Sequence, residues 1–435
     1  MKNYQKIYNS YLEGNERLLI KHILPEYYID CNINKHNISV DYTLRFLQNE
    51  LNSILNSFIN GGFSQKGFIL YPFVKDVSDD NLNRLSRLKN IVVFLNNNGY
   101  NFSNSIKKYR EKICNKFFTV IISALYRDFS LIKNKNVKYI EKYKCKELEI
   151  NNYRKDGLGY LSPLNELKDY ANKELKQYLS GFYLHGSLAT EDYVKGWSDA
   201  DTLAVVSKET IENPKGLLEL RDRIYFMRYF FYRIDPLQHH GSIVITEYDL
   251  ENYCHTYFPV PIFKYAKSFF RDDRISYFKA RDYSSESFNR LFWFVNYFRK
   301  LNMEKTFNLG SYDIKTLLHS ITLFPTMYLQ ANGIIVYKKF SFDIAKKDFK
   351  DSWEVIDDVS SIRSNWKYLG VIPLISLYSK MNPILCYQLN SRIIDLFKDI
   401  KKINDINIKN MVESMFKLSE EAWSRIKKNA RSKKL

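Results

Sequence analysis

Two carboxylates stand two residues apart, directly in front of an apolar segment. The sequence WSDADTLAVV places Asp199 and Asp201 just before the apolar residues 203–206. Alternate side chains of a strand share a face, so both carboxylates would point to one side, about 6–7 Å apart along the chain. Carboxylates at that spacing can bind one Mg²⁺ or a pair of ions ~4 Å apart, and Mg²⁺ often shares its ligand shell with substrate phosphates. The pattern therefore predicts a magnesium site for a phosphate-bearing ligand.

A Gly-Ser turn precedes the two carboxylates. In HGSLAT, Gly186 and Ser187 follow a short apolar segment, and eleven residues separate Ser187 from Asp199. Glycine lets a phosphate approach the backbone, a following helix start presents free N–H groups, and the serine hydroxyl adds a donor. We therefore expect Gly186 and Ser187 to bind phosphate next to the metal site on Asp199 and Asp201.

The joint pattern resembles the signature of the DNA polymerase β-like nucleotidyltransferase superfamily, in which a Gly-Ser turn and a short helix precede an Asp-x-Asp strand. HGSLAT and WSDADTLAVV look more like the bacterial branches that modify small molecules or proteins than like the polymerases. The C-terminal helices loosely resemble the helical substrate domain of aminoglycoside-type nucleotidyltransferases. The main likeness covers about residues 164–250. It implies that Gly186 and Ser187 hold the β- and γ-phosphates of a nucleotide and that Asp199 and Asp201 hold the metals.

The chain departs from this family at the third carboxylate. The family usually has an Asp or Glu near the start of the strand after the long helix. Here the segment reads RIDPLQHHGSIVITEYDLENY, and Gln238, His239 or His240 occupies that place. Histidine is a poor Mg²⁺ ligand but titrates near neutral pH, so His240 or His239 is expected to deprotonate the acceptor. Two alternatives stay open: a hydrogen-bonded histidine pair that caps the strand, or Asp235 or Glu247 as the third carboxylate.

Three other positions each allow two interpretations. Trp197 can stack on a base or pack a short helix, and the packing role is favoured. His185 precedes the Gly-Ser turn and fits a hydrogen-bonded core histidine. Lys338 and Lys339 can reach a triphosphate from the C-terminal region, although a solvated loop pair is the simpler expectation.

Helix and strand signals alternate around these motifs. The expected elements, in chain order, are a helix capped by Ser162 and ended by Gly181, a strand at 182–186, a short helix at 188–196, a strand at 199–206, a helix opened by Asn213 and Pro214, and a strand at 241–247. Helical periodicity dominates elsewhere, including 42–59, a helix at 313–333 kinked or split at Pro325, and one at 341–366 that starts at Ser341.

The expected fold class is therefore α+β, with helix predominant overall. Residues 1–160 form a helical N-terminal domain of unassigned role, and residues 161–265 form a nucleotidyltransferase core with a mixed sheet. Residues 266–435 form a C-terminal helical domain that binds the acceptor and ends in a basic tail after Trp423.

The composition favours some classes of protein and argues against others. The chain has 435 residues and a net charge of +18, which attracts polyanions, but the basic residues are spread along the sequence. Five distant cysteines without a CxxC pair argue against a disulfide framework or a zinc site. A cytoplasmic protein is expected, because neither a signal-peptide core nor an apolar run of membrane-spanning length is found.

These features predict a Mg²⁺-dependent transfer of a nucleoside monophosphate from an NTP to the hydroxyl of a small molecule or protein, with release of pyrophosphate. Asp199, Asp201 and His240 are the expected catalytic residues. One alternative is a template-free RNA nucleotidyltransferase; nucleic acid is not favoured as a partner, because the sequence lacks a known RNA-binding module. The other is a catalytically silent nucleotide-binding or scaffold protein, which the missing third carboxylate would explain.

Overall fold

In the computed structural model, a mixed five-stranded sheet lies at the centre of the fold. Its strand order is β2-β6-β3-β4-β5, with β4 and β5 parallel and β3 antiparallel to both of its neighbours. The strands are β2 (Lys146–Glu147), β3 (Leu179–Leu184), β4 (Thr202–Val206), β5 (Ile243–Thr246) and β6 (Lys267–Ser268). A separate antiparallel pair joins β1 (Val137–Lys144) to β7 (Ile275–Arg281). The predicted α+β class with a mixed sheet is confirmed.

The structure describes residues 40–60, 79–102, 106, 114–132, 137–151, 153, 160–238, 240–255, 258–270, 275–281, 284–304, 307, 309–349, 351–367, 385, 389, 393, 394, 396 and 400–432. Among these residues, none of the helices combines the length and the apolar character that a membrane span requires.

Strand β4 is buried throughout, and apolar after Thr202, because both faces of the sheet are covered. Ala204 and Val206 belong to the larger core, which they share with the helices on one face. Leu203 and Val205 point the other way, into a smaller core with Phe258. A central strand buried on both faces reads as a continuous apolar run rather than as an alternation, which explains the TLAVV sequence.

Two helices cover the first face of the sheet. α7 (Ser162–Tyr170) leads through a π-helical turn (Ala171–Leu175) into β3, and α10 (Pro214–Ile234) connects β4 to β5. The side chain of Asn213 caps α10 by accepting from the backbone of Lys215 and Gly216, as its position before Pro214 predicts. Short helices complete the core: α8 (Gly186–Ala189), α9 (Lys208–Ile211), α11 (Glu247–Leu250) and the 3₁₀ helix η5 (Val260–Lys264).

One N-terminal helix packs on the edge strand β5 of this sheet, and two further helices pack against that helix, the second of them also against α10. They are α4 (Val40–Ile59), α5 (Asp79–Asn97) and α6 (Asn115–Ser130). Asn56 of α4 donates to the carbonyl of Val244 and accepts from its N–H, so an asparagine takes the place of a neighbouring strand. The described N-terminal helices therefore share the core of the sheet, and residues 137–147 add strands within the segment 1–160.

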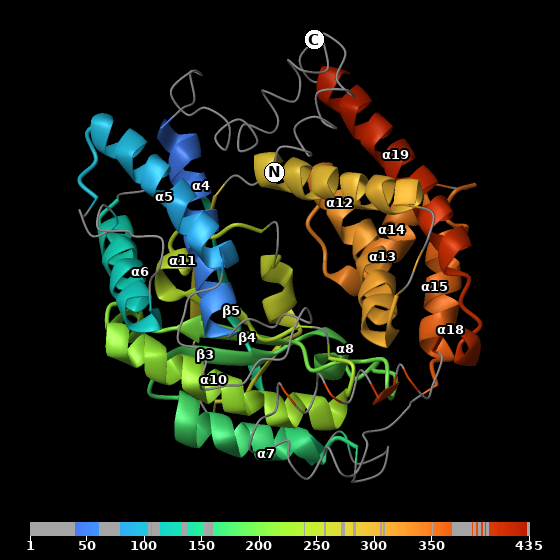
Figure 1. Cartoon of the computed structure of the whole chain (residues 1–435), viewed down its shortest axis with the longest axis horizontal. Coiled ribbons are helices and arrows are strands. Elements are labelled where there is room, and N and C mark those ends of the chain that lie inside the picture. The colour runs from blue at the N-terminus through green and yellow to red at the C-terminus, as the bar shows by residue number, and fades with distance from the viewer. Residues whose placement is uncertain are drawn as a thin grey trace.

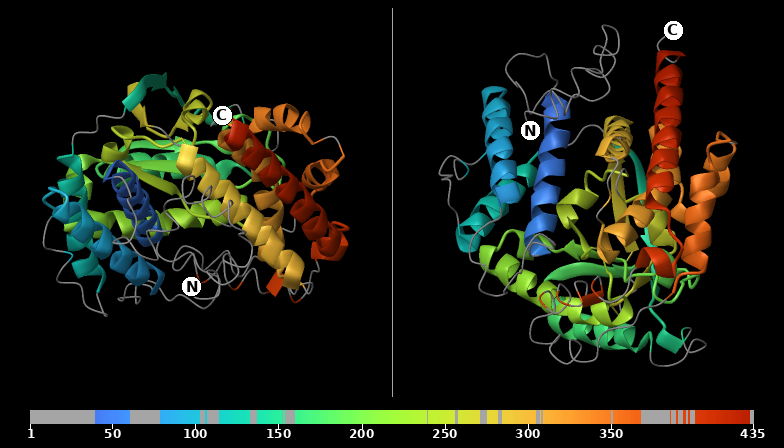
Figure 2. Two further views of the ribbon diagram at one scale, coloured as in Figure 1. Left: turned by 90° about the horizontal axis from the view of Figure 1, so that it is seen from above. Right: turned by 45° about the vertical axis from the view of Figure 1, so that its right-hand side comes forward.

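The C-terminal helices form a second group with its own apolar core. They are α12 (Ser284–Glu304), α13 (Ser311–Ala331), α14 (Lys338–Lys346), α15 (Glu354–Ser364), α18 (Ile400–Ile403) and α19 (Ile408–Ser432). Figure 1 shows α4–α6 and α12–α19 on opposite sides, with the sheet, α7 and α10 below them, and Figure 2 shows the same separation from other directions. The helix α19 continues through the basic segment after Trp423 as far as Ser432.

Three predicted helix boundaries are wrong. Ser162 makes no capping hydrogen bond, and the cap position is Leu161. Gly181 lies inside β3, where the Tyr183 ring would come within 2.6–2.8 Å of a β-carbon at this position, so close approach and not helix termination requires the glycine. The short helix starts at Gly186 and ends at Ala189, before Glu191, whose φ of 61° is incompatible with a helix.

The C-terminal expectations also need correction. The helix expected to be kinked or split at Pro325 is not split, because α13 continues past Pro325 to Ala331. The predicted helix at 341–366 is two helices, α14 and α15, and Ser341 is an interior residue of α14. The Ser341 hydroxyl donates to the carbonyl of Lys338 and lies 3.1 Å from the Thr326 hydroxyl, so the serine joins α14 to α13 rather than capping a helix.

A buried ion pair joins the two halves of the chain. Lys315 of α13 is fully buried and pairs with the carboxylate of Asp235, which also accepts from the N–H of Leu237. Lys315→Met should lower the free energy of unfolding by about 3–5 kcal/mol, because it leaves an uncompensated buried carboxylate. Adding Asp235→Asn should recover much of the loss, since the amide can still accept from Leu237. Chemical denaturation of both variants tests this, and equal stability of the single and double variants would contradict it.

Candidate functional site

Three chain segments meet at one end of the sheet. β3 and β4 are antiparallel, so His185 at the end of β3 lies beside Asp201 at the start of β4, and its N–H donates to the Asp201 carbonyl at 2.9 Å. β5 is parallel to β4, so the segment before β5, which contains His240, reaches the same edge. The topology thereby brings residues from three sequence positions together.

Asp199, Asp201 and His240 form one cluster. One ligand atom from each lies within 4.8 Å of the other two. The Nε2 atom of His240 is 2.9 Å from Asp201 Oδ1 and 3.3 Å from Asp199 Oδ2. The side chain of Asp199 is almost fully buried, whereas those of Asp201 and His240 are partly exposed. The structure therefore brings the two predicted carboxylates together and adds His240 as the third member.

The other ring nitrogen of His240 fixes its hydrogen-bonding state. Nδ1 lies 2.9 Å from the carbonyl oxygen of Gly241, which only accepts, so Nδ1 carries the hydrogen. In the neutral ring, Nε2 then carries a lone pair that points toward the carboxylates. Metal-binding histidines that donate from Nδ1 to a backbone carbonyl have the same arrangement. Burial would lower the pKa of His240, but contact with the Asp199 and Asp201 carboxylates outweighs it and raises that pKa well above the usual range.

The donor set fits a divalent cation. Two carboxylates and one imidazole offer oxygen and nitrogen ligands at mutual distances that one ion can span. Mg²⁺ prefers oxygen ligands throughout, whereas Mn²⁺ accepts oxygen and imidazole together. Asp199, Asp201 and His240 could therefore hold the expected Mg²⁺, and they suit Mn²⁺ better.

Gly186 brings the backbone directly against this cluster. Its φ is +71°, and a β-carbon there would lie 2.1 Å from Asp201 Oδ2. Ser187 donates from its hydroxyl to that of Ser198 at 2.8 Å, and Ser198 in turn accepts from the N–H of Val194. Both hydroxyls line the cavity beside the carboxylates. The Gly-Ser turn is thus positioned next to the acids, as the sequence predicts.

Gln238 holds the two loops of the site in register. Its side chain accepts from the N–H of Ala200 at 2.9 Å and donates to the Ala200 carbonyl at 3.3 Å. It also donates to the carbonyl of His240 at 3.0 Å. One fully buried amide therefore fixes the Asp199–Asp201 segment, which precedes β4, to the segment that carries His240.

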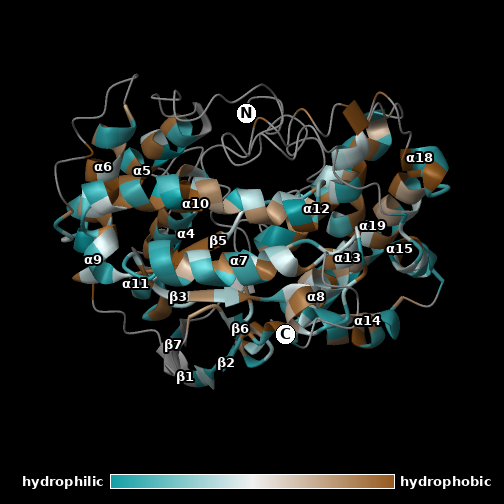
Figure 3. Cartoon of the chain, turned by 90° about the horizontal axis from the view of Figure 1, so that it is seen from below, coloured by the Kyte–Doolittle hydropathy of each residue, from teal (hydrophilic) through white to brown (hydrophobic). Residues whose placement is uncertain are grey.

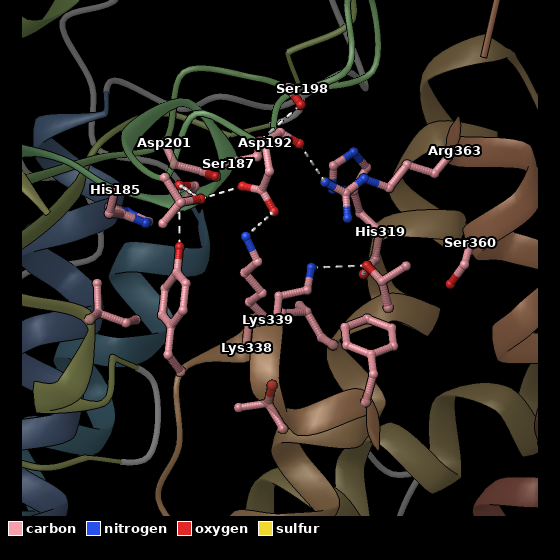
Figure 4. Close-up of a pocket in the computed structure, with 18 of the residues that line it drawn as sticks. His185, Ser187, Asp192, Ser198, Asp201, His319, Lys338, Lys339, Ser360 and Arg363 are labelled. Atoms are coloured by element: carbon pink, nitrogen blue, oxygen red, sulfur yellow. Dashed lines mark hydrogen bonds and ion pairs between the residues drawn. The ribbon is translucent and has the colours of Figure 1, made fainter. Parts of the chain in front are cut away.

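The cluster lies on one wall of a cavity of about 590 Å³ between the sheet and the C-terminal helices. The opposite wall is basic. Lys338, Lys339 and Arg363 project into the space that faces Asp201 and Ser187 (Figure 4), and Arg290 also lines it. Lys339 pairs with Asp192 at 3.1 Å. The cavity thus has an acidic side, which can hold a cation, and a basic side, which can hold an anion.

Lys338 is a half-buried cation of the basic wall. Its Nζ donates to the Thr322 hydroxyl at 2.9 Å and makes no ion pair with a carboxylate that the structure describes. Burial lowers the pKa of Lys338 to about 8; the Asp201 charge opposes this shift and the Arg363 charge adds to it. The nearby Arg363 has a buried Nε without a hydrogen-bond partner among the described residues. An anion between these side chains would compensate both.

The other candidates for the third acidic or basic group lie outside the cluster or outside the described residues. Asp235 forms an ion pair with Lys315. Burial raises the pKa of Asp235 to about 6, although the Lys315 charge opposes this shift. Glu247 follows the far end of β5 and accepts from the backbone of Lys208, so neither of these acids joins the cluster. His239 lies outside the described residues.

Two aromatic candidates have packing contacts. Trp197 is buried and stacks on His319 with ring centroids 4.6 Å apart, which agrees with the packing role. His185 is half-buried against the edge of Phe258, and desolvation lowers its pKa although the Asp201 charge opposes the shift. Its ring makes a hydrogen bond with the backbone of Thr202, in line with the expected hydrogen-bonded histidine, whereas its Nε2 atom has no hydrogen-bond partner among the residues described.

Several residues of the cavity were missed in the sequence. Ser198 directly precedes Asp199 and could have been found by that proximity. Arg290, Tyr337 and Arg363 carry no local signal, because they lie more than ninety residues after Asp199 on helices or connections of the C-terminal group. Only Lys338 and Lys339 of this wall were considered, as a residue pair preceding a helix.

No family model, curated protein or solved structure matches the chain. The functional assignment therefore depends on the geometry of this site.

The close approach of Gly186 gives a test of the cation site. Gly186→Ala should weaken Mn²⁺ binding at least about tenfold, because the new methyl group must displace the Asp201 carboxylate. Gly333→Ala is the matched control, since Gly333 has a φ of +81° and open space around it, so it carries the backbone strain alone. Electron paramagnetic resonance titration of Mn²⁺ measures both. Equal affinity in the two variants would show that the turn does not support the cluster.

Proposed function

We propose that the chain is a divalent-cation-dependent nucleotidyltransferase, which moves a nucleoside monophosphate from an NTP to an acceptor hydroxyl and releases pyrophosphate. One observation carries the proposal: the Asp199–Asp201–His240 cluster and the basic wall of Lys338 and Arg363 face each other across one cavity. A polyphosphate with a bound cation matches both walls. The acidic cluster can bind the cation, and the basic wall can bind the phosphates.

The chain's own residues would position the two reactants. Lys338 and Arg363 would bind the β- and γ-phosphates, and the Ser187 and Ser198 hydroxyls would donate to phosphate oxygens at the Gly-Ser turn. A cation on Asp199, Asp201 and His240 would neutralise charge on the phosphates as it develops. The acceptor oxygen bonds to the α-phosphorus, the bond to the β-phosphate bridging oxygen breaks, and pyrophosphate leaves with that electron pair. Catalysis of this kind is mainly positioning and electrostatics.

His240 has one of two exclusive roles. If Nε2 holds the cation while Nδ1–H donates to Gly241, the ring has no site left for the acceptor proton. If it is the general base predicted from the sequence, Nε2 must face the acceptor hydroxyl instead. The distances of 2.9 and 3.3 Å to the two carboxylates favour the ligand role, and the acceptor proton then passes to Asp201 or to solvent.

Turnover of labelled NTP in the presence of cell lysate tests the function. With Mn²⁺ or Mg²⁺, the wild type should release pyrophosphate and label an acceptor. Asp199→Asn and Asp201→Asn should each lower the rate about 10²–10³-fold, because a cation ligand is lost. Asp343→Asn is the control, since Asp343 is an exposed carboxylate in the same cavity outside the cluster. Absence of turnover with all four NTPs would rule out the function and leave the silent binding protein.

His240→Ala separates the two roles of the histidine. As a ligand, His240 is needed for Mn²⁺ affinity, and His240→Asp should restore binding while shifting preference from Mn²⁺ toward Mg²⁺. As a base, His240 is needed for turnover alone, and His240→Ala should keep its Mn²⁺ affinity. The titration and the rate measured on the same preparations decide between them.

The half-buried Lys338 gives the cavity a pH dependence. The pKa of Lys338 is lowered to about 8, so its positive charge is present below that pH and is lost as pH rises through it. Affinity for a non-hydrolysable NTP analogue should therefore fall between about pH 7.5 and 9.5 in the wild type. In Lys338→Met, affinity should be low and should lack this dependence. Equal pH profiles in the two proteins, measured by calorimetry, would remove Lys338 from the phosphate site.

A further inference from the structure

A second, smaller cavity of about 350 Å³ adjoins the first one. Four segments form it: the strand β2, the end of α8, the η5–β6 connection and the start of α14. Figure 3 shows α8, α14, β6 and β2 gathered in one part of the molecule. Thr190, Tyr337 and Lys339 line both cavities, so the second one, hereafter the side groove, opens beside the Gly-Ser turn.

The side groove is basic. Lys146, Lys264, Lys267 and Lys339 line it, and none of the described residues that line it is acidic. Lys267 pairs with Glu191, and Lys339 pairs with Asp192 at 3.1 Å. Lys146 and Lys264 are exposed and make no ion pair with a described carboxylate. Two lysine charges are therefore available to an anionic partner at the mouth of the groove.

The side groove also carries a stack of aromatic rings. Tyr265 stacks on Tyr337 with centroids 4.8 Å apart and an interplanar angle of 24°, and Phe340 lies 5.8 Å from Tyr265. Phe340 is 46% exposed. Burying the exposed face of Phe340 against a planar group would gain the stacking energy that single-strand-binding proteins obtain from unpaired bases.

The stack leads to the catalytic cluster. The hydroxyl of Tyr337, its innermost ring, donates to the carbonyl of Gly186 at 3.2 Å, and the position next to Gly186 is occupied by Asp201. A partner that lies along the lysines and rings therefore arrives beside the carboxylates. The side groove is continuous with the site of the proposed reaction rather than a separate surface.

We propose that the side groove binds a single-stranded nucleic acid, whose terminal hydroxyl is the acceptor of the nucleoside monophosphate; this inference rests on the proposed function. Phosphates would pair with Lys146 and Lys264, and an unpaired base would stack on Phe340. The terminal hydroxyl oxygen forms a bond to the α-phosphorus, pyrophosphate leaves, and the strand grows by one nucleotide. The chain's net charge of +18 adds a general attraction for such a polyanion.

Binding is measured separately from turnover, so that each proposal can fail alone. The probe is a labelled single-stranded RNA of about 12 nucleotides, titrated by fluorescence anisotropy between about 50 and 200 mM salt. Lys146→Ala with Lys264→Ala should flatten the slope of log affinity against log salt by about 1.4, since each lost phosphate contact contributes about 0.7 for a single strand. Phe340→Ala should weaken binding about tenfold.

Matched controls isolate the groove. Lys173→Ala with Lys215→Ala removes the same charge from two lysines that are 82% and 86% exposed, near the opposite end of the sheet. Phe226→Ala removes a ring of similar exposure, 42%, from α10. Both controls should bind the RNA as the wild type does, and none of these variants should change affinity for the NTP analogue.

Defined outcomes overturn the proposal. RNA binding that is equal in groove and control variants excludes the groove as its site. Equal affinity for a duplex of the same sequence, or full competition by tripolyphosphate at matched phosphate concentration, shows a site that recognises charge without unpaired bases. Label that moves only to a protein or a small molecule refutes the acceptor class and leaves the nucleotidyltransferase intact. Groove-dependent RNA binding without NTP turnover refutes the nucleotidyltransferase instead.

Discussion

Negative charge concentrated at the end of a buried strand is the constraint on which the rest of the site depends. Asp199 is nearly buried, and its carboxylate lies beside that of Asp201, so two like charges share a region with little water. Such a pair is stable only with positive charge close by. His240 supplies part of it by direct contact, and the basic wall with Lys338 supplies more across the cavity. The position of the C-terminal helices against the sheet is thus an electrostatic requirement of the two aspartates as well as a matter of packing.

The parts of the site that the sequence predicted are those encoded within a short segment. Gly186, Ser187, Asp199 and Asp201 lie within sixteen residues, at the adjoining ends of the paired strands β3 and β4, so local spacing determines where they meet. The apolar run of β4 and the Asn213–Pro214 cap were readable for the same reason, since each depends on adjacent residues. His240 needed the order of β4 and β5 in the sheet as well, which explains why sequence spacing left three candidates and two alternatives at that position.

The unpredicted parts depend on contacts between distant segments. The pairing of β1 with β7 joins residues about 140 positions apart, and no local pattern indicates it. The basic wall has the same origin, because Arg290 and Arg363 come from helices that reach the cavity only when two cores are packed together. Misplaced boundaries followed from side-chain contacts: Gly181 appeared to end a helix because its true requirement, room for the Tyr183 ring, is invisible in the sequence.

The pairing of Asp235 with Lys315 has a consequence for the order in which the protein can form during synthesis. The two residues are 80 positions apart, so at about 5–20 residues per second the lysine leaves the ribosome roughly 4–16 s after the aspartate. Until then Asp235, which follows the end of α10, lacks this counter-ion, so burying its carboxylate carries an uncompensated desolvation cost. Closing the β5 edge of the sheet on the nascent chain is therefore less favourable, by about 3–5 kcal/mol, until α13 has emerged. During that interval the unfinished apolar surface around Trp197 and Leu237 is exposed to chaperones.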